Sequence, residues 1–591
     1  MPYELKVDNE KETRQKTTIQ KIVGGLNLLD REDQIDPSEM LRLKNLRLDR
    51  GKMIQDTGYV AFADAILGTP QADYQFFKKT GVSELMLVTT VSLYRYNSVV
   101  DQWQYVKGTA GTTLTAQANA GATSLAVVSI AGFSNGDKVG VTLDDGTQHR
   151  TTVNGVPAGT TIVILDAIPA GRNAPNGAAL VRAVVLGGNL DKLVSMDTIP
   201  SHDWFVFTNG VDKPKRYDGT DCVDIPNLPS GGNTICIALR LYNKALFLFN
   251  TLEGGTAFPQ RARRSDIGDP TNWTTGTAGF DDLYDGSDFI LTGEVLGPYL
   301  VVYRERSIER GEFIGQGGVN YFFQSMIKGE GVCSSSGIVD MGDYHVILGN
   351  ANIYEYRAGF DLDPIGDKIW PTLFGPSANV NPSMRRRGFA FFVEELNEIW
   401  FFLPTALSSN CDRLLRYNIS EENWAERIFA HKFTGYGFYI KQTTLDWASL
   451  IGDWAAQTWF WGTATTQEDS PTTHLTADTG GQVYEYNYIA NSDAGAAISF
   501  IFETKDFLMS EALIRLDTIE GFLRGTNVLV EYSLNEGSSW VSVGTVSNST
   551  NTKFLLGKQE VTQRIRFRFS GSDPQFMLTF FEFYWKLETP R

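Results

Sequence analysis

The feature that most constrains this chain is a hairpin of two apolar strands that recurs along the sequence. Each copy is an apolar strand, a turn of two to five residues and a second strand that often ends in tyrosine. The copies lie at 84–97, 204–219, 238–250, 298–313, 343–359 and 389–404, and the last is followed by a strand at 413–424. The last four start roughly 45 to 60 residues apart, close to the blade repeat of a β-propeller. Their shared shape favours a propeller over a set of unrelated sandwich domains.

The composition agrees with an all-β chain of several domains. Of its 591 residues, 42% are hydrophobic and 12% aromatic, which is enough to fill several cores. The 57 glycines, 36 phenylalanines and 23 tyrosines favour short strands and tight turns over long helices. We therefore predict a β-propeller with an inserted small β-barrel or sandwich domain and a C-terminal β-sandwich.

Changes of composition set the predicted domain boundaries. Residues 109–183 are rich in Ala, Gly, Thr and Val with turn signals between short strands, which predicts a small β domain inserted between two propeller strands. Near the start, Asp36 and Pro37 are typical of a helix start, and 40–48 fits either two helical turns or a strand. The predicted organisation is a polar arm at 1–20, an N-terminal segment with the first blade at 21–108, the inserted domain at 109–183, the remaining blades at 184–481 and the sandwich at 482–591.

The charge and the cysteines exclude some classes of protein. A net charge of −17 makes a conventional DNA binder with one basic face improbable, because phosphate repels an acidic surface. The four cysteines form no CxxC pair and the chain has five histidines, so we expect free thiols, no metal site and no cofactor. The N-terminus has no apolar signal-peptide core, and no apolar run reaches the length of a membrane span. We expect synthesis in a cytoplasm.

Acidic residues offer the main catalytic alternative. Asp281 and Asp282, with Asp285 and Asp288, could act as glycosidase carboxylates or as a calcium loop, but a solvated turn closing a blade is favoured, since nothing there fixes a separation or raises a pKa. The pair His202 and Asp203 is interpreted as a surface turn, and the five histidines as isolated. Residues 533–540 fit an Asp-box hairpin turn with Asn in place of Asp, which carries no activity. We expect no catalytic residues.

The segment 261–303 contains one of two dense basic clusters. Residues 261–273 form a polar turn closed by Trp273, and we expect it to lead into a blade whose inner strand is 297–307. The two clusters are Arg261, Arg263 and Arg264, and Arg385, Arg386 and Arg387. If both lie on one rim, they could contact phosphate or an acidic neighbouring subunit. Ion pairs between blades or between subunits are the favoured alternative.

Several motifs follow one another in an order that resembles a known family. They are GGLNLLDREDQIDPSEMLRLKNLRLDRGKMIQDTGY at 24–59, RRSDIGDPTNW at 263–273, DDLYDGSDFI at 281–290, LVVYRERSIERGEFIG at 300–315, GNANIYEYRAGFDLDPIGDKI at 349–369 and RLLRYNISEENW at 413–424. Together they resemble the tail nozzle or hub proteins of short-tailed bacteriophages, also described as packaged-DNA stabilisation or tail tubular proteins. The inserted stretch 123–153 also resembles a small β module of phage virion proteins.

The resemblance implies a structural protein of the virion tail. It implies a homo-oligomeric ring, a hexamer, that lies below the portal and adaptor proteins and docks tail fibres or a tail tip. The ring would retain the packaged genome, contact double-stranded DNA transiently in its lumen during ejection, and come close to the host envelope. It also implies that the chain is not an enzyme and has no catalytic, metal or cofactor residues to carry over.

Two alternatives stay open at the level of the sequence. One is a fibre-docking or receptor-binding tail protein that uses the inserted domain at 109–183 as its adhesive module. The other is a virion-associated glycan hydrolase that uses the acids of 281–288. The sequence sets neither the ring order nor the number of blades.

Overall fold

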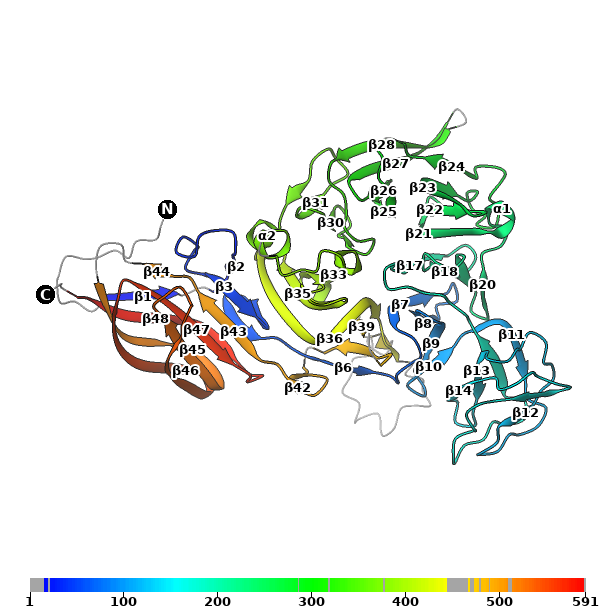
Figure 1. Ribbon diagram of the computed structural model, residues 1–591, viewed down its shortest axis with the longest axis horizontal. Helices are drawn as coiled ribbons and strands as arrows, with labels where there is room; N and C mark the ends of the chain where they lie inside the picture. Colours follow the sequence, from blue (N-terminus) through cyan, green and yellow to red (C-terminus); the bar gives the residue numbers. More distant parts are fainter. Residues whose placement is uncertain are drawn as a thin grey trace, which may run out of the picture. The chain divides into compact units, whose positions relative to one another are not determined.

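The chain folds almost entirely into β-strands, which confirms the all-β propeller class (Figure 1). The computed structural model describes residues 15–19, 22–284, 286–316, 319–375, 378–443, 466–467, 472–477, 480–487, 489–508 and 513–588. Most of the predicted polar arm therefore lies outside the described residues. The chain divides into two compact units, one formed by 61–331 with 433–486 and the other by 1–60, 332–432 and 487–591.

Four antiparallel sheets of four strands each form most of the unit 61–331 with 433–486 (Figure 1). Their strands are β7 (Pro70–Phe77), β8 (Ser83–Thr89), β9 (Leu93–Asn97) and β10 (Gln102–Tyr105); β17 (Ser195–Ile199), β18 (Trp204–Thr208), β19 (Lys215–Tyr217) and β20 (Cys222–Asp224); β21 (Thr234–Tyr242), β22 (Ala245–Glu253), β23 (Thr256–Arg264) and β24 (Gly279–Asp282); and β25 (Ile290–Leu296), β26 (Tyr299–Arg304), β27 (Ser307–Gln316) and β28 (Val319–Lys328). Within each sheet the strands are neighbours in chain order. Each sheet packs on the next through shared apolar clusters, as blades of a propeller do.

The hairpins predicted in this unit are confirmed, with one correction. The segments 84–97, 204–219 and 298–313 are β8–β9, β18–β19 and β26–β27. However, 261–273 does not lead into the blade of 297–307, because it runs from β23 toward β24 within the third sheet, and the fourth sheet starts only at β25. Trp273 is not at the surface but lies buried in the core that joins the second and third sheets.

The inserted segment forms two small sheets with their own apolar core. Its strands are β11 (Lys107–Thr113), β12 (Ser124–Ala126), β13 (Lys138–Thr142), β14 (Gln148–Thr152), β15 (Thr161–Val163) and β16 (Ala179–Ala183). Polar side chains attach it to the first sheet of the propeller: the backbone N–H of Tyr105 donates to Oε1 of Gln148 at 2.6 Å, and that of Gln148 donates to Oε1 of Gln102 at 2.7 Å. Arg150 forms an ion pair with Asp64.

A further group of paired strands joins distant parts of the chain and is part of a larger sheet. It contains β39 (Thr472–Ala477), β40 (Val483–Tyr486), residues 433–439 of β36 (Asn423–Tyr439) and residues of β6 (Tyr59–Phe62). The remaining elements here are β37 (Gln442–Thr443), β38 (Thr466–Gln467) and the short helix α1 (Pro229–Gly232). Because β6 and β40 are far apart in sequence, this pairing ties early and late segments together.

The second unit contains two more blade-like sheets. One is a separate sheet of β29 (Ile338–Asp340), β30 (His345–Leu348), β31 (Ile353–Tyr356) and β32 (Asp363–Pro364). The other is a group of successive strands within a larger, 20-stranded sheet: β33 (Phe389–Val393), β34 (Glu398–Leu403), β35 (Cys411–Asn418) and the first part of β36. These strands confirm the predicted hairpins at 343–359 and 389–404. The short helices are η1 (Asp367–Ile369), α2 (Trp370–Leu373), η2 (Arg385–Arg387) and η3 (Glu394–Leu396).

Long strands at the C-terminus pair with N-terminal strands and belong to the same 20-stranded sheet. The elements are β1 (Gln15–Ile19), β2 (Gly25–Leu26), β3 (Glu39–Lys44), β4 (Leu46–Asp49), β5 (Lys52–Gln55), β41 (Ser492–Asp493), β42 (Ala496–Ala497), β43 (Phe500–Thr504), β44 (Phe507–Leu508), β45 (Leu513–Ser533), β46 (Val541–Thr562), β47 (Arg564–Gly571) and β48 (Met577–Glu588). Of the two alternatives for 40–48, the strand is confirmed. The predicted turn at 533–540 is also confirmed, with Oδ1 of Asn535 accepting the N–H of Ser539 at 2.9 Å.

Candidate functional site

The first arginine cluster lies on β23 of the third sheet and is bound to acids of the neighbouring strands β22 and β24. Nε of Arg261 donates to Oδ1 of Asp282 at 2.7 Å, and Nε of Arg263 donates to Oε1 of Glu253 at 3.0 Å. Arg264 pairs with a third acid, Asp281. These ion pairs join strands of one blade, whereas the favoured alternative placed them between blades or subunits. The register of β23 and β24 places Arg261 directly opposite Asp282.

Aromatic rings complete this arginine cluster. The guanidinium of Arg261 lies 3.6 Å from the ring centre of Phe258 and 3.8 Å from that of Phe280, so both of its faces are covered. Arg264 lies 5.1 Å from the ring centre of Tyr321, a residue of the fourth sheet. The cluster therefore helps to hold strands together.

The acids next to these arginines do not form an acid and base pair. Bonding to Arg261 lowers the pKa of Asp282, whereas burial raises the pKa of Asp281 despite the nearby Arg264. Divergent pKa values are typical of catalytic pairs, but successive residues of a strand point to opposite faces of the sheet. Asp281 and Asp282 therefore cannot act on one bond. Asp285 lies outside the described residues.

The second arginine cluster belongs to the other compact unit and forms the short helix η2. Nη1 of Arg385 donates to the carbonyl oxygen of Asn350 at 3.0 Å, and Nη1 of Arg387 donates to Oδ1 of Asn410 at 2.8 Å. Arg386 donates to the carbonyl oxygen of Ser383.

A charged cluster that the sequence did not predict lies on the first strands of three successive sheets. Arg240 of β21 lies 3.7 Å from Oδ2 of Asp197 on β17, and it also pairs with Glu294 on β25. Oδ2 of Asp197 accepts the N–H of Leu241 at 2.7 Å. Burial alone would lower the pKa of Arg240, but Glu294 and Asp197 outweigh it and raise that pKa. An arginine within the apolar run of 234–242 was the available signal.

Two of the histidines lie in different surroundings, one buried beside an acid and one in a turn. His474 was interpreted as isolated, and this is wrong: its Nδ1 lies 2.5 Å from Oδ2 of Asp73, with both side chains completely buried between β39 and β7. The ring of Phe62 lies 4.3 Å from the His474 ring. His202, by contrast, is in the predicted turn before β18 and bonds to Ser201. His474 and Asp73 are far apart in sequence, so no local motif marks them.

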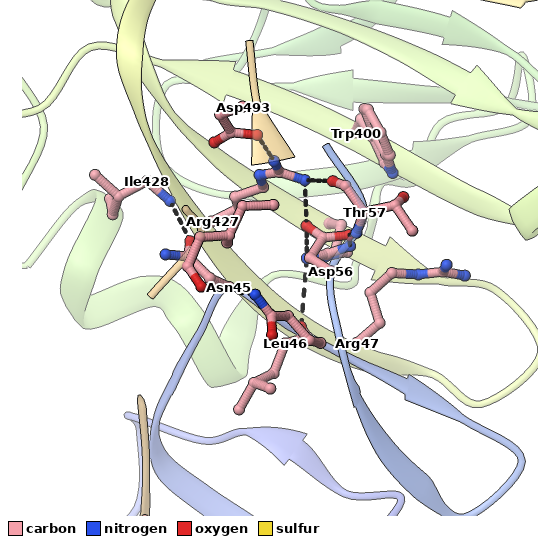
Figure 2. Close-up of polar contacts among 12 residues, drawn as sticks. Asn45, Leu46, Arg47, Asp56, Thr57, Trp400, Arg427, Ile428 and Asp493 are labelled. Carbon is pink, nitrogen blue, oxygen red and sulfur yellow. Dashed lines mark hydrogen bonds and ion pairs between the residues drawn. The ribbon is translucent and has the colours of Figure 1, made fainter. Parts of the chain in front are cut away.

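A largely buried ion cluster lies in the second unit (Figure 2). Asp56, in the connection after β5, accepts from Nη2 of Arg416 at 2.6 Å and from Nη1 of Arg427 at 2.7 Å. Nη2 of Arg427 donates in turn to Oδ1 of Asp493 at 2.5 Å. The cluster links four separate segments and resembles a structural network more than a site open to a ligand.

Within the described ranges, no group of three or more His, Cys, Asp and Glu side chains is placed to hold a metal ion. Among the same residues, no helix has the length and apolar content needed to cross a membrane.

Comparisons with known proteins give structural matches alone. No protein-family profile matches the chain, and no curated protein matches it. Solved structures that match include a glycoside hydrolase, 11% identical over 66% of this chain and 96% of that one with a TM-score of 0.21, and an exo-β-1,3-galactanase from Phanerochaete chrysosporium, 8% identical over 58% and 94% with a TM-score of 0.22. A third is Hsv2 of Kluyveromyces lactis, 11% identical over 61% and 98% with a TM-score of 0.23.

These matches correct one expectation. Glycoside hydrolases recur among the matched structures, which contradicts our expectation that the chain is not an enzyme, and we withdraw it. Identities of 8 to 11% with TM-scores near 0.2 assign neither an activity nor a substrate to this chain.

Proposed function

We propose that the chain is a ring-forming subunit of a bacteriophage tail that retains packaged DNA and conducts it below the portal and adaptor. The observation that carries the proposal is how the family-like motifs fall on the fold. The motif at 263–273 occupies the corner between β23 and β24, and the motifs at 300–315, 349–369 and 413–424 fall on β26–β27, β31–η1 and β35–β36. The resemblance is thus spread over successive blades rather than confined to one local element.

The charge distribution supports a conduit. A net charge of −17 disfavours lasting contact between the chain and a phosphate backbone. Arg261, Arg263 and Arg264 are neutralised by carboxylates, which removes one of the two basic clusters as a strong DNA contact. DNA could then slide past a wall with few attachment points.

The test is assembly with the expected partners. The purified chain is mixed with portal and adaptor, and its mass is measured by light scattering before the particles are imaged. A closed ring of six copies stacked on the adaptor is expected. A chain that stays monomeric with both partners present would overturn the proposal.

A second candidate, glycan hydrolysis, is favoured by the carboxylates of the cluster around Arg240. Hydrolysis of a glycosidic bond uses two facing carboxyl groups, and Asp197 and Glu294 both approach Arg240 from neighbouring first strands. Release of reducing sugar from host-surface polysaccharide by the wild-type chain, lost in both D197N and E294Q and kept in D281N, would support this candidate. No release by the wild-type chain would reject it.

A third candidate, fibre docking or receptor binding, depends on the inserted domain. Its separate core makes deletion of residues 109–183 a reasonable test. Intact virions with an altered host range would favour this candidate, whereas virions that leak DNA would favour the proposed nozzle.

A further inference from the structure

The fourth sheet of the first unit carries a polar cavity of about 200 Å³. It lies where the connection before β25, the start of β27 and the end of β28 meet, and its described lining consists of serines, glycines, two acids and two cations, with no apolar side chain. The volume is below the roughly 300 to 1,000 Å³ typical of sites for drug-sized ligands. The cavity therefore suits one small polar group.

The two acids of the lining are already engaged. Arg304 is completely buried and pairs with both Asp288, at 3.3 Å, and Glu309. Oδ2 of Asp288 also accepts the N–H of Arg306 at 2.9 Å and the hydroxyl of Ser307 at 3.0 Å. Their acceptor oxygens are directed to protein donors, so they offer little to a ligand.

The donors of the lining remain available. The side chains of Arg306 and Lys328 are exposed. Burial raises the pKa of Glu305, and the charge of the adjacent Arg306 opposes that rise. The hydroxyls of Ser287 and Ser325 belong to the same lining. Glu305 and Glu330 are close in sequence but do not line the cavity. The lining thus offers two cations and two hydroxyls, and the oxygens of its two acids are already bonded to protein groups. This combination favours an anion with several oxygen acceptors.

We propose that this cavity binds a phosphate group. The inference rests on the proposed function, in which the group is a phosphodiester of double-stranded DNA, and free inorganic phosphate is the other source of the same chemistry. In this arrangement Arg306 supplies a planar fork of donors, Lys328 a point charge, and the serines neutral donors. The paired arginines of β23 do not take part, because their charge is already balanced.

The test compares two double variants. Each replaces one arginine and one lysine by alanine, but at different positions. The first is R306A with K328A. The matched control is R310A with K138A, since Arg310 lies on β27 over the ring of Tyr299 and Lys138 lies on β13, both away from the cavity lining. Binding of inorganic phosphate is measured by calorimetry, and binding of a short DNA duplex is measured across a salt series. Thermal melting checks that each variant is folded.

The expected result is that R306A/K328A weakens phosphate binding on the order of tenfold or more, while the control variant binds as the wild-type chain does. If the ligand is DNA, the slope of log affinity against log salt also falls by about 1 in R306A/K328A, the share of one phosphate. Loss of phosphate binding with an unchanged DNA slope supports the site with free phosphate as its ligand. No phosphate binding by the wild-type chain, or equal losses in both variants, overturns the proposal. Ring assembly is measured separately, so a failure of the nozzle proposal is distinguishable from a failure of this site.

Discussion

Asp56 and Arg427 hold each other with both side chains completely buried, Oδ2 of the carboxylate lying 2.7 Å from Nη1 of the guanidinium (Figure 2). Burial alone would raise the pKa of Asp56, but Arg416 and Arg427 outweigh it and hold that pKa well below its ordinary value. The carboxylate is therefore ionised in the folded chain. Its contribution to stability is present above the pKa of an unfolded aspartate, about 4, and declines as the pH falls below that value.

We expect D56N to destabilise the second unit by about 3 to 5 kcal/mol, because it leaves Arg416 and Arg427 buried with too little negative charge. The unfolding transition in denaturant, followed by tryptophan fluorescence, measures the loss. D343N is the matched control, since the Asp343 side chain is 80% exposed and its contact with Arg357 is 3.8 Å long. The D343N chain should unfold at nearly the same denaturant concentration as the wild-type chain. Equal stability of D56N and D343N would show that the buried network contributes nothing.

Asp493 should give stability the opposite dependence on pH. Burial raises the pKa of Asp493 to about 6, against the attraction of Arg427. Because this folded-state pKa exceeds the unfolded one, the folded chain binds a proton more tightly, and this group favours folding more as the pH falls through 6. Between about pH 7.5 and 5.5 the wild-type chain should gain about 1 kcal/mol relative to D493N. Denaturant unfolding at both values measures the difference, and parallel pH profiles of the two chains would contradict the prediction.

The attachment of the inserted domain should depend on Gln148. Its Oε1 accepts the N–H of Tyr105 at 2.6 Å in a buried position, so Q148A leaves that N–H without this acceptor at a cost of about 1 to 3 kcal/mol. Hydrogen exchange of β10 should become faster. Q117A is the control, since Gln117 lies on the same domain and bonds to Asn119 at the surface. Exchange in β10 that is unchanged in Q148A would show that other contacts hold the domain.

The repeating hairpins were predictable because each strand of a covered blade must be apolar along its length. Strands β26 and β30 follow this rule, with Val301 and Val302, and Val346 and Ile347, all buried. The assignment of hairpins to blades was not predictable from the same pattern. An apolar run shows that a strand is covered but not which sheet it joins. The polar turn at 261–273 likewise does not show whether it connects two strands of one blade or two blades, and the structure places it between β23 and β24 of one sheet.

The charged clusters were harder to predict for a different reason. Arg240, Asp197 and Glu294 come from three separate strands. His474 and Asp73 lie 401 residues apart in the sequence. In both cases the spacing of the residues in the sequence does not indicate that they are in contact. The arginines of 261–264 form a dense basic cluster in the sequence, but the sequence does not identify all of their acidic partners. Glu253 comes from a neighbouring strand, and only the register of β22 and β23 brings it near.

Glu253 provides a last prediction, on what the first arginine cluster contributes. It is buried, it accepts from Nε of Arg263 at 3.0 Å, and it lies 3.4 Å from Nη1 of Arg261. In E253Q, Arg261 keeps Asp282 as its partner, but Arg263 loses its carboxylate partner. We therefore expect the free energy of local opening of β23, measured by hydrogen exchange, to fall by about 2 to 3 kcal/mol. E312Q, at an exposed position of β27, should change little. The double variant E253Q/R263Q should recover part of the loss, because it removes the unbalanced charge together with its partner. Additive losses in the double variant would mean that Glu253 acts through packing and not through its charge.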